Sequence, residues 1–281
     1  MNQEPIRIGE INYTNVWPIY FYFPKDAFAE EVEFIKQVPA ELNRAMRRGE
    51  VDMGAISSFA FGQAENNYAL LPDLSVSAYG KVKSILLFHK KPLELLKSSR
   101  IALPTTSATS VHLLKIILAK FYDADPEYFY AAPDLGKMLV DADAALLIGD
   151  HAIQAEWSNP DLYVTDLGAL WKECTGSWMT YAVWAIRKET VRKYPLLVQR
   201  ILNAFLSSKN KGMHNLQEIV DAAHQQLGGT RSFWQRYLSN LNFDFGPEQQ
   251  DGLSLYFRYA KELGYIKKPV EFQLLHSQEV I

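Results

Sequence analysis

The sequence has little of the chemistry that marks secreted or membrane proteins. It holds one cysteine, Cys174, in 281 residues. No disulfide can therefore form within the chain, and cysteine usage gives no sign of an oxidising compartment. No apolar run approaches the length that spans a bilayer. The first ten residues, MNQEPIRIGE, are polar and charged and lack the apolar centre of a secretory signal. We therefore expect a cytoplasmic protein with no membrane association.

The patterns of metal, nucleotide and nucleic-acid sites are also missing. The six histidines are scattered, without paired ligand spacing or a companion cysteine, and no glycine-rich phosphate loop occurs. Cys174 has no base beside it in the sequence, and we interpret it as structural. The formal net charge is -3, which gives no reason to expect a polyanionic partner. These absences argue against a metal site, against the common nucleotide-binding loops and against a nucleic-acid partner.

What is present is an ordinary globular composition, with 48% hydrophobic and 22% charged residues. Strand-like and helix-like stretches alternate from the start, which predicts an α/β fold with a parallel sheet and helices on its faces. Predicted strands lie at Ile6–Ile11, Val32–Val38, Asp52–Ile56, Arg100–Leu103, Tyr128–Tyr130, Ala144–Ile148 and Tyr163–Thr165, with longer extended runs at Leu74–Phe88 and Tyr181–Ile186. Predicted helices lie at Pro39–Arg48, Phe59–Ala64, Ser107–Phe121, Lys137–Val140, Leu167–Glu173, Tyr194–Leu206, Leu216–Leu227, Ser232–Leu238 and Glu248–Leu263.

The order of these elements predicts two α/β lobes. The first comprises residues 1–88 and 182–281, including the C-terminal helices, and the second is the insertion 89–181. The extended runs Val82–Phe88 and Tyr181–Arg187 would connect them. Two connections of similar length give a hinge, with a cleft between the lobes.

A polar turn, Asn12–Asn15, follows the first predicted strand and precedes a short aromatic helix. In open α/β sheets, ligands bind at the edge where strands end and helices begin. The amide of Asn15 offers two donors and an acceptor oxygen, which can orient a substrate without adding charge. The alternative is that Thr14 or Asn15 only caps the following helix.

Hydroxyl groups gather at predicted helix starts, namely at Ser57, Ser58, Ser107, Thr109 and Ser110. Unpaired N–H groups at helix N-termini bind carboxylates or phosphates, so this cluster favours a receptor for a small anion. Each hydroxyl taken alone has the simpler interpretation of an N-cap. Ser84 falls within the first connecting run, and Asp150 and Asp166 follow predicted strands, where an acid is either functional or a cap.

Six segments, in order, resemble the motifs of one family: Arg7–Pro18, Gly49–Ser58, Gly80–Ile85, Ser107–Ser110, Ala144–Asp150 and Asp166–Ala185. The family is chorismate dehydratase of the futalosine route to menaquinone. Each motif alone is weak, but the ordered set is specific. The sequence departs from the pattern at Asn12, where serine is usual, at Ser57, where proline is usual, and at Ser177–Trp178, where Leu-Pro is common. These departures would reshape the flanks of the pocket.

The resemblance implies a type II periplasmic-binding-protein-like fold used as a cytoplasmic enzyme without cofactor or metal. The implied reaction dehydrates chorismate to 3-[(1-carboxyvinyl)oxy]benzoate. Asn15 takes the position of the family's active-site Asn and Ser84 that of a serine near the substrate, so both are predicted to be catalytic. The residues predicted to bind substrate are Ser57, Ser58, Ser107, Thr109, Ser110, Gly149 and Asp150. Chorismate is the expected partner, and the choice between monomer and homodimer stays open.

Two alternative functions share this fold. The sister family, 1,4-dihydroxy-6-naphthoate synthase, typically carries an Ile-His-Glu triplet whose histidine is a candidate base. The corresponding place here is Ile148-Gly149-Asp150, which favours the dehydratase. A non-catalytic solute-binding protein would use the same anion-binding groups, and the missing export signal argues against it.

Overall fold

The computed structural model describes residues 4–275. It has the α/β composition predicted from the sequence, and several elements have the predicted bounds. Strand β1 (Ile6–Ile11), the buried strand β8 (Ala144–Ile148) and helix α2 (Pro39–Arg48) begin and end at the predicted residues. Pro39 opens α2, and Gly49 closes it in the left-handed conformation with φ of 74°.

The chain divides by its internal contacts into two compact units. Unit 1 comprises the described residues up to Ser77, the segment Tyr181–Pro247 and the described residues from Val270 onward. Unit 2 comprises Ala78–Thr180 and Glu248–Pro269. These boundaries differ from the predicted lobes 1–88 with 182–281 and 89–181, chiefly because the last long helix, α12 (Pro247–Glu262), groups with unit 2.

The sheet of unit 1 has the strand order β2-β1-β3-β10-β4. Besides β1, its strands are β2 (Val32–Gln37), β3 (Met53–Ser57), β4 (Tyr68–Ala78) and β10 (Met179–Arg187). β1 pairs in parallel with β2 and β3, as the alternation of strands and helices predicts. β10 runs antiparallel to β3, so the sheet is mixed where the sequence predicts a parallel one.

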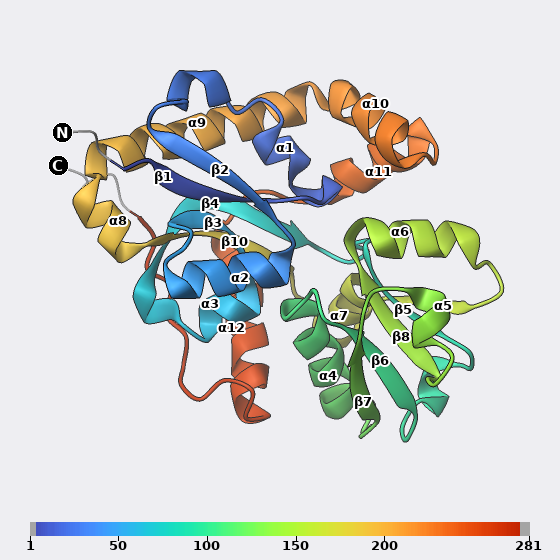
Figure 1. The fold of residues 1–281 in the computed structure, drawn as a ribbon. Coiled ribbons are helices and arrows are strands. Elements are labelled where there is room, and N and C mark those ends of the chain that lie inside the picture. Colours follow the sequence, from blue (N-terminus) through green and yellow to red (C-terminus); the bar gives the residue numbers. More distant parts are fainter. Residues whose placement is uncertain (1–3, 276–281) are drawn as a thin grey trace. The chain divides into compact units, whose positions relative to one another are not determined.

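Helices cover both faces of this sheet, with α9 and α1 on one side and α2 and α3 on the other (Figure 1). The remaining helices of unit 1 are α1 (Trp17–Tyr20), α3 (Ser58–Gly62), α8 (Lys188–Lys193), α9 (Pro195–His214), α10 (Leu216–Leu227) and α11 (Arg231–Asn240), with short 3-10 turns η1 (Thr14–Val16), η2 (Lys25–Phe28) and η3 (Glu65–Asn67). α1 packs against α9 at Gly212, where a Cβ would lie 2.2 Å from the carbonyl oxygen of Pro18. This close approach fixes α1, which directly follows the turn that holds Asn15, against α9.

The sheet of unit 2 has the order β7-β6-β8-β5-β9. Besides β8, its strands are β5 (Ile85–His89), β6 (Arg100–Pro104), β7 (Glu127–Ala131) and β9 (Tyr163–Asp166). β6 is parallel to β7 and β8, whereas β5 is antiparallel to both β8 and β9. The helices are α4 (Thr109–Phe121), α5 (Leu135–Met138), α6 (Gly149–Ser158), α7 (Leu167–Thr175) and most of α12, with the turn η4 (Leu93–Leu95). No element was predicted between Asp150 and Ser158, where α6 lies.

Contacts with α7 and α4 explain why α12 belongs to unit 2. The ring of the buried Trp171 on α7 lies edge-on to Tyr256 and Tyr259 of α12, with centroids 6.4 and 6.1 Å away. The hydroxyl of Tyr256 also donates to the carbonyl oxygen of Thr109, at 3.2 Å. Aromatic pairs of this kind add to the free energy gained by burying the rings.

The predicted extended run Leu74–Phe88 is wrong as one element, because it forms two strands in two different sheets. β4 ends at Ala78 and β5 begins at Ile85. Between them Gly80 and Lys83 have φ of 98° and 60°, outside the extended region that is typical of strands. The predicted connecting run Val82–Phe88 therefore lies inside unit 2, and the chain first passes between the units at Ser77–Ala78.

Candidate active site

Asn15 lies in the turn η1, directly after β1 and before α1. The N-cap residues of η1 and α1 are Tyr13 and Val16, and neither makes a side-chain cap. The alternative that Thr14 or Asn15 caps a helix is therefore wrong. The amide oxygen of Asn15 is buried and has no hydrogen-bond partner within residues 4–275. Leaving a buried acceptor unpaired costs about 1–3 kcal/mol, so this amide is a strong candidate for contact with a substrate.

Ser57 caps α3, as its alternative interpretation predicts. Its hydroxyl accepts hydrogen bonds from the backbone N–H of Ala60 at 3.2 Å and from the side-chain amide of Asn43 at 3.1 Å. The oxygen of the same Asn43 amide accepts from the backbone N–H of Ser57 at 3.0 Å. A hydroxyl with both lone pairs engaged still has its proton to donate. Ser57 is thus oriented as a donor, by an asparagine that no sequence signal had marked.

The carboxyl ends of the three parallel strands bring these groups to one edge of the unit 1 sheet. Ile11, the last residue of β1, pairs with Gln37, the last of β2, and β1 also lies beside β3, which ends at Ser57. The side-chain oxygen of Gln37 is buried and, like that of Asn15, has no partner in the described chain. Gln37 was missed because nothing in a strand sequence tells which polar end residue lacks a partner. Ser58, which follows Ser57 and is the first residue of α3, is fully buried.

In unit 2, Ser84 and Gly149 meet through a backbone hydrogen bond. The N–H of Gly149 donates to the carbonyl oxygen of Ser84 at 2.7 Å, and the antiparallel pair that follows aligns Ile85 with Ile148. Ser84 is 2% exposed, and its hydroxyl donates to the carbonyl oxygen of Val82 over a long 3.4 Å. A bond that long is weak, so the hydroxyl can exchange it for a better acceptor.

The turn Ser107–Ser110 lies at the same edge, because β6 is parallel to β8 and ends at Pro104. The hydroxyl of Ser107 accepts from the backbone N–H of Ser110 at 3.2 Å, whereas the N-cap residue of α4 is Ala108, which makes no side-chain cap. Thr109 and Ser110 are buried. The hydroxyl of Thr106, which the sequence did not single out, is buried without a partner among the residues described.

Titratable groups are scarce at these positions. Asp150 alone among the predicted site residues is titratable, and it lies in the first turn of α6, where the helix dipole favours an acid. On α4, burial lowers the pKa of His112 to about 4, and the ring donates from Nδ1 to the carbonyl oxygen of Ala108 at 2.8 Å. His112 is therefore neutral near pH 7. Burial raises the pKa of Cys174, which keeps it a thiol.

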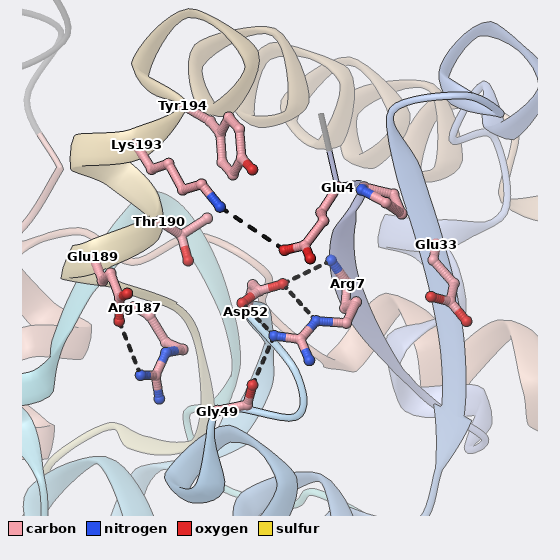
Figure 2. Close-up of a pocket in the computed structure, with 11 residues that line it drawn as sticks. Glu4, Arg7, Glu33, Gly49, Asp52, Arg187, Glu189, Thr190, Lys193 and Tyr194 are labelled. Carbon is pink, nitrogen blue, oxygen red and sulfur yellow. Dashed lines mark hydrogen bonds and ion pairs between the residues drawn. The ribbon is translucent and has the colours of Figure 1, made fainter. Parts of the chain in front are cut away.

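A pocket of about 400 Å³ lies at the opposite end of β1 from Asn15 (Figure 2). Its lining is ionic, and the guanidinium of Arg7 binds both carboxylate oxygens of Asp52 at 2.9 Å. The same guanidinium donates to the carbonyl oxygen of Gly49 at 2.6 Å, and Arg187 donates to that of Met46 at 3.1 Å. The two arginines thus satisfy the last carbonyls of α2. We interpret this pocket as a structural junction, and none of the predicted site residues lines it.

A second pocket of unit 1, of about 730 Å³, is lined by Asn12 of the predicted turn and by Trp17, the first residue of α1. Phe21 and Phe23 add aromatic surface to it. Lys25 on its rim is paired with Glu10, at 2.6 Å.

Within residues 4–275 no group of three or more His, Cys, Asp or Glu side chains is arranged to hold a metal ion. Over the same residues, every helix is too short or too polar to cross a bilayer.

Comparison with known proteins places this fold and this sequence among relatives. The periplasmic aliphatic sulphonate-binding protein SsuA from Escherichia coli superposes with a TM-score of 0.69 at 14% identity, over 98% of this chain and 92% of that one. An identity this low shows the fold alone. The fold expected from the sequence, that of the periplasmic binding proteins, is confirmed.

Two curated relatives come from Thermus thermophilus. The chain is 34% identical over 275 residues to a chorismate dehydratase, covering 92% of this chain and 96% of the relative. It is 25% identical over 247 residues to a 1,4-dihydroxy-6-naphtoate synthase, covering 86% and 85%. A family model described as menaquinone biosynthesis matches residues 6–262. The chain therefore belongs to the menaquinone biosynthesis family.

Proposed function

We propose that the chain is a chorismate dehydratase that converts chorismate to 3-[(1-carboxyvinyl)oxy]benzoate and water. The observation that carries the proposal is the match, over nearly the whole of both chains, to the Thermus chorismate dehydratase. The candidate groups are consistent with it, because apart from Asp150 they are amides, hydroxyls and backbone groups rather than acids and bases. The enzyme is then a hydro-lyase, and we propose that it works without cofactor or metal in the cytoplasm.

The reaction needs orientation and charge stabilisation more than strong acid–base catalysis. Chorismate loses the proton on the ring carbon that carries the enolpyruvyl ether, and the neighbouring ring hydroxyl leaves. The electron pair of the broken C–H bond completes the aromatic ring, and proton and hydroxyl leave together as one water. Aromatisation supplies the driving force, so the chain has to hold the substrate in the reactive geometry.

Asn15 is proposed to hold the group that takes the proton. Its buried amide oxygen has no partner in the described chain, and its NH₂ group is proposed to donate to the enolpyruvyl carboxylate of the substrate. That carboxylate is the proposed proton acceptor, since none of the predicted residues is a strong base. Ser84 is proposed to donate a hydrogen bond to the leaving hydroxyl, in place of its long bond to Val82.

The remaining predicted residues are proposed to bind the two carboxylates of chorismate. Ser57 has a proton to donate, because Asn43 and Ala60 occupy its lone pairs. The turn at Ser107, Thr109 and Ser110 offers hydroxyls at the start of α4. Gly149 and Asp150 lie at the start of α6, where the N-terminus of the helix favours an anion. Ser58 is assigned to the same role.

Turnover separates this function from its alternatives. The purified chain is mixed with chorismate, and the products are followed by chromatography and mass spectrometry. A product lighter by one water, with aromatic absorbance, is the expected result. Unchanged chorismate that nevertheless raises the melting temperature would support a solute-binding protein instead. Unchanged chorismate with formation of 1,4-dihydroxy-6-naphthoate from that synthase's own substrate would assign the sister activity.

A further inference from the structure

The short segment before β5 has a backbone that needs external support. Lys83 has φ of 60°, in the left-handed region that a lysine adopts at a cost of about 1 kcal/mol or more. Ser84 follows it directly, so the direction in which Ser84 enters β5 depends on this conformation. A residue held in such a conformation persists only when its surroundings fix it.

The carboxylate of Asp166 provides that support. One of its oxygens, Oδ2, accepts from the backbone N–H of Lys83 at 2.7 Å. The other, Oδ1, accepts from the N–H of Val82 at 3.1 Å. This is an interaction across 84 and 83 positions of the sequence.

The same carboxylate also begins α7. Oδ1 accepts from the N–H groups of Gly168 and Ala169 at 2.9 and 3.0 Å. Asp166 itself is fixed in the sheet, where it ends β9 and pairs with Leu86 of β5. An N-cap needs only the bonds to Gly168 and Ala169. The two further bonds tie the cap to the segment that carries Ser84.

We propose that Asp166 is a positioning residue for Ser84: its carboxylate holds the left-handed turn at Lys83 and thereby sets the place of the Ser84 hydroxyl. This inference rests on the proposed function, in which Ser84 contacts the leaving hydroxyl. Asp166 acts on the backbone of the turn and does not contact the substrate. The bonds that cap α7 hold the carboxylate in place.

The variant Asp166→Asn separates the two tasks of the carboxylate. An asparagine keeps one acceptor oxygen, which preserves the cap of α7. Its NH₂ group then faces the N–H of Lys83, two donors without an acceptor, so the bond at 2.7 Å is lost. We expect kcat for chorismate to fall by about 100-fold with KM changed less than about threefold, because a small misplacement costs that much.

Asp134→Asn is the matched control. Asp134 caps α5 in the same unit by accepting from the N–H of Lys137 at 3.2 Å, and it has no bond to the Ser84 segment. It should keep wild-type kcat. A fall in kcat of similar size in both variants would assign the effect to loss of a cap and overturn the proposal.

A second substitution distinguishes positioning from direct chemistry. Glycine adopts positive φ without strain, so Lys83→Gly in the Asp166→Asn background should restore at least about tenfold of the lost kcat. If the carboxylate acted directly on the substrate, a glycine at position 83 would restore nothing, and that result would overturn the positioning role.

Hydrogen exchange judges the inference independently of turnover. In Asp166→Asn the amides of residues 82–84 should exchange faster, while those of α7 stay protected. If the wild-type chain leaves chorismate unchanged, the proposed function fails. Hydrogen exchange then still tests whether Asp166 holds the turn at Lys83. Unaltered exchange at residues 82–84 would then show that Asp166 does not hold the turn.

Discussion

The backbone N–H of Gly149 donates to the carbonyl oxygen of Ser84 at 2.7 Å, and this bond joins the start of α6 to the start of β5. Gly149 makes it with φ of 60°, a conformation that favours glycine. The turn at Ser84 and the turn at Gly149, which both carry predicted site residues of unit 2, are therefore one connected structure.

Replacing Gly149 should damage activity more than stability. Gly149→Ala introduces a side chain at positive φ, which costs about 1–2 kcal/mol of the free energy of unfolding. It should also shift the carbonyl of Ser84 and lower kcat about tenfold or more. Gly176→Ala is the control, because Gly176 also has positive φ, 68°, with open space around it and no bond to Ser84. Equal kcat values in the two variants would contradict the connection.

The amide of Asn15 should matter for turnover and little for folding. Asn15→Ala removes a side chain whose oxygen has no partner in the described chain, so no hydrogen bond to that oxygen is lost. We expect an unchanged melting temperature and a kcat lowered by about 100-fold. Asn66→Ala, at an exposed asparagine bonded only to Glu65, serves as control and should leave both values at wild type. Wild-type kcat in Asn15→Ala would remove Asn15 from the catalytic account.

Asn43 should act on substrate binding through Ser57. Asn43→Ala breaks its bonds of 3.1 and 3.0 Å with Ser57 and should lower the free energy of unfolding by about 1–2 kcal/mol. Asn43→Asp keeps the acceptor for the N–H of Ser57 but offers its hydroxyl a second acceptor. The proton of Ser57 then turns away from substrate, and KM for chorismate should rise severalfold with little change in stability. A KM at wild type in Asn43→Asp would show that Ser57 does not donate to the substrate.

The burial of His112 makes stability depend on pH in a definite window. Its pKa is about 4 in the folded chain, below the ordinary value of 6.5, chiefly because burial disfavours the charged ring and partly because Lys115 is near. The ring of Tyr265 lies edge-on to that of His112, with the two centroids 5.2 Å apart. Folding therefore favours the neutral ring. The contribution of His112 to the free energy of unfolding is complete above about pH 6.5 and is lost as the pH falls toward 4.

The measurement is the melting temperature of wild type and His112→Gln between pH 4 and 8. The difference between them should be constant above pH 7. Below about pH 6.5 the free energy of unfolding of the wild type should fall by up to about 1.4 kcal/mol per pH unit relative to that of the variant. Parallel curves across the whole range would show that His112 does not titrate as a buried group.

Substitutions in the pocket of Figure 2 should change the free energy of unfolding and leave kcat unchanged. Asp52→Asn weakens the two-oxygen bond to Arg7, which also holds the carbonyl of Gly49, and should cost about 1–3 kcal/mol of the free energy of unfolding. Glu50→Gln, whose pair with Arg48 is exposed, should cost nothing measurable. Both variants should keep wild-type kcat at a temperature where they are folded. A selective loss of kcat in Asp52→Asn would assign this pocket a role in the reaction.

The sequence was informative where a pattern is local. β1, β8 and α2 have the predicted bounds, because alternation, an apolar run and the Pro39–Gly49 pair are signals within one element. The same local signals put Asn15 and Ser57 at the ends of strands. The capping interpretation was right for Ser57 and wrong for Asn15, a difference that depends on side-chain contacts and not on residue type.

What the sequence could not predict depends on contacts between distant segments. Lysine rarely has positive φ, so nothing marked Lys83 as the place where the run Leu74–Phe88 breaks. The support for that turn comes from Asp166, 83 residues away. Likewise, the grouping of α12 with unit 2 depends on the contact between the rings of Trp171 and Tyr256. The periodicity of the sequence indicates on which helix face each ring lies but does not indicate its partner.

Dehydration by this chain is tested with chorismate deuterated at the ring carbon that carries the enolpyruvyl ether. The chain is incubated with it, and the mass of the product is determined. We expect an aromatic product that has lost one water together with the whole of the deuterium. Unchanged substrate, or a product that retains the label, would contradict it.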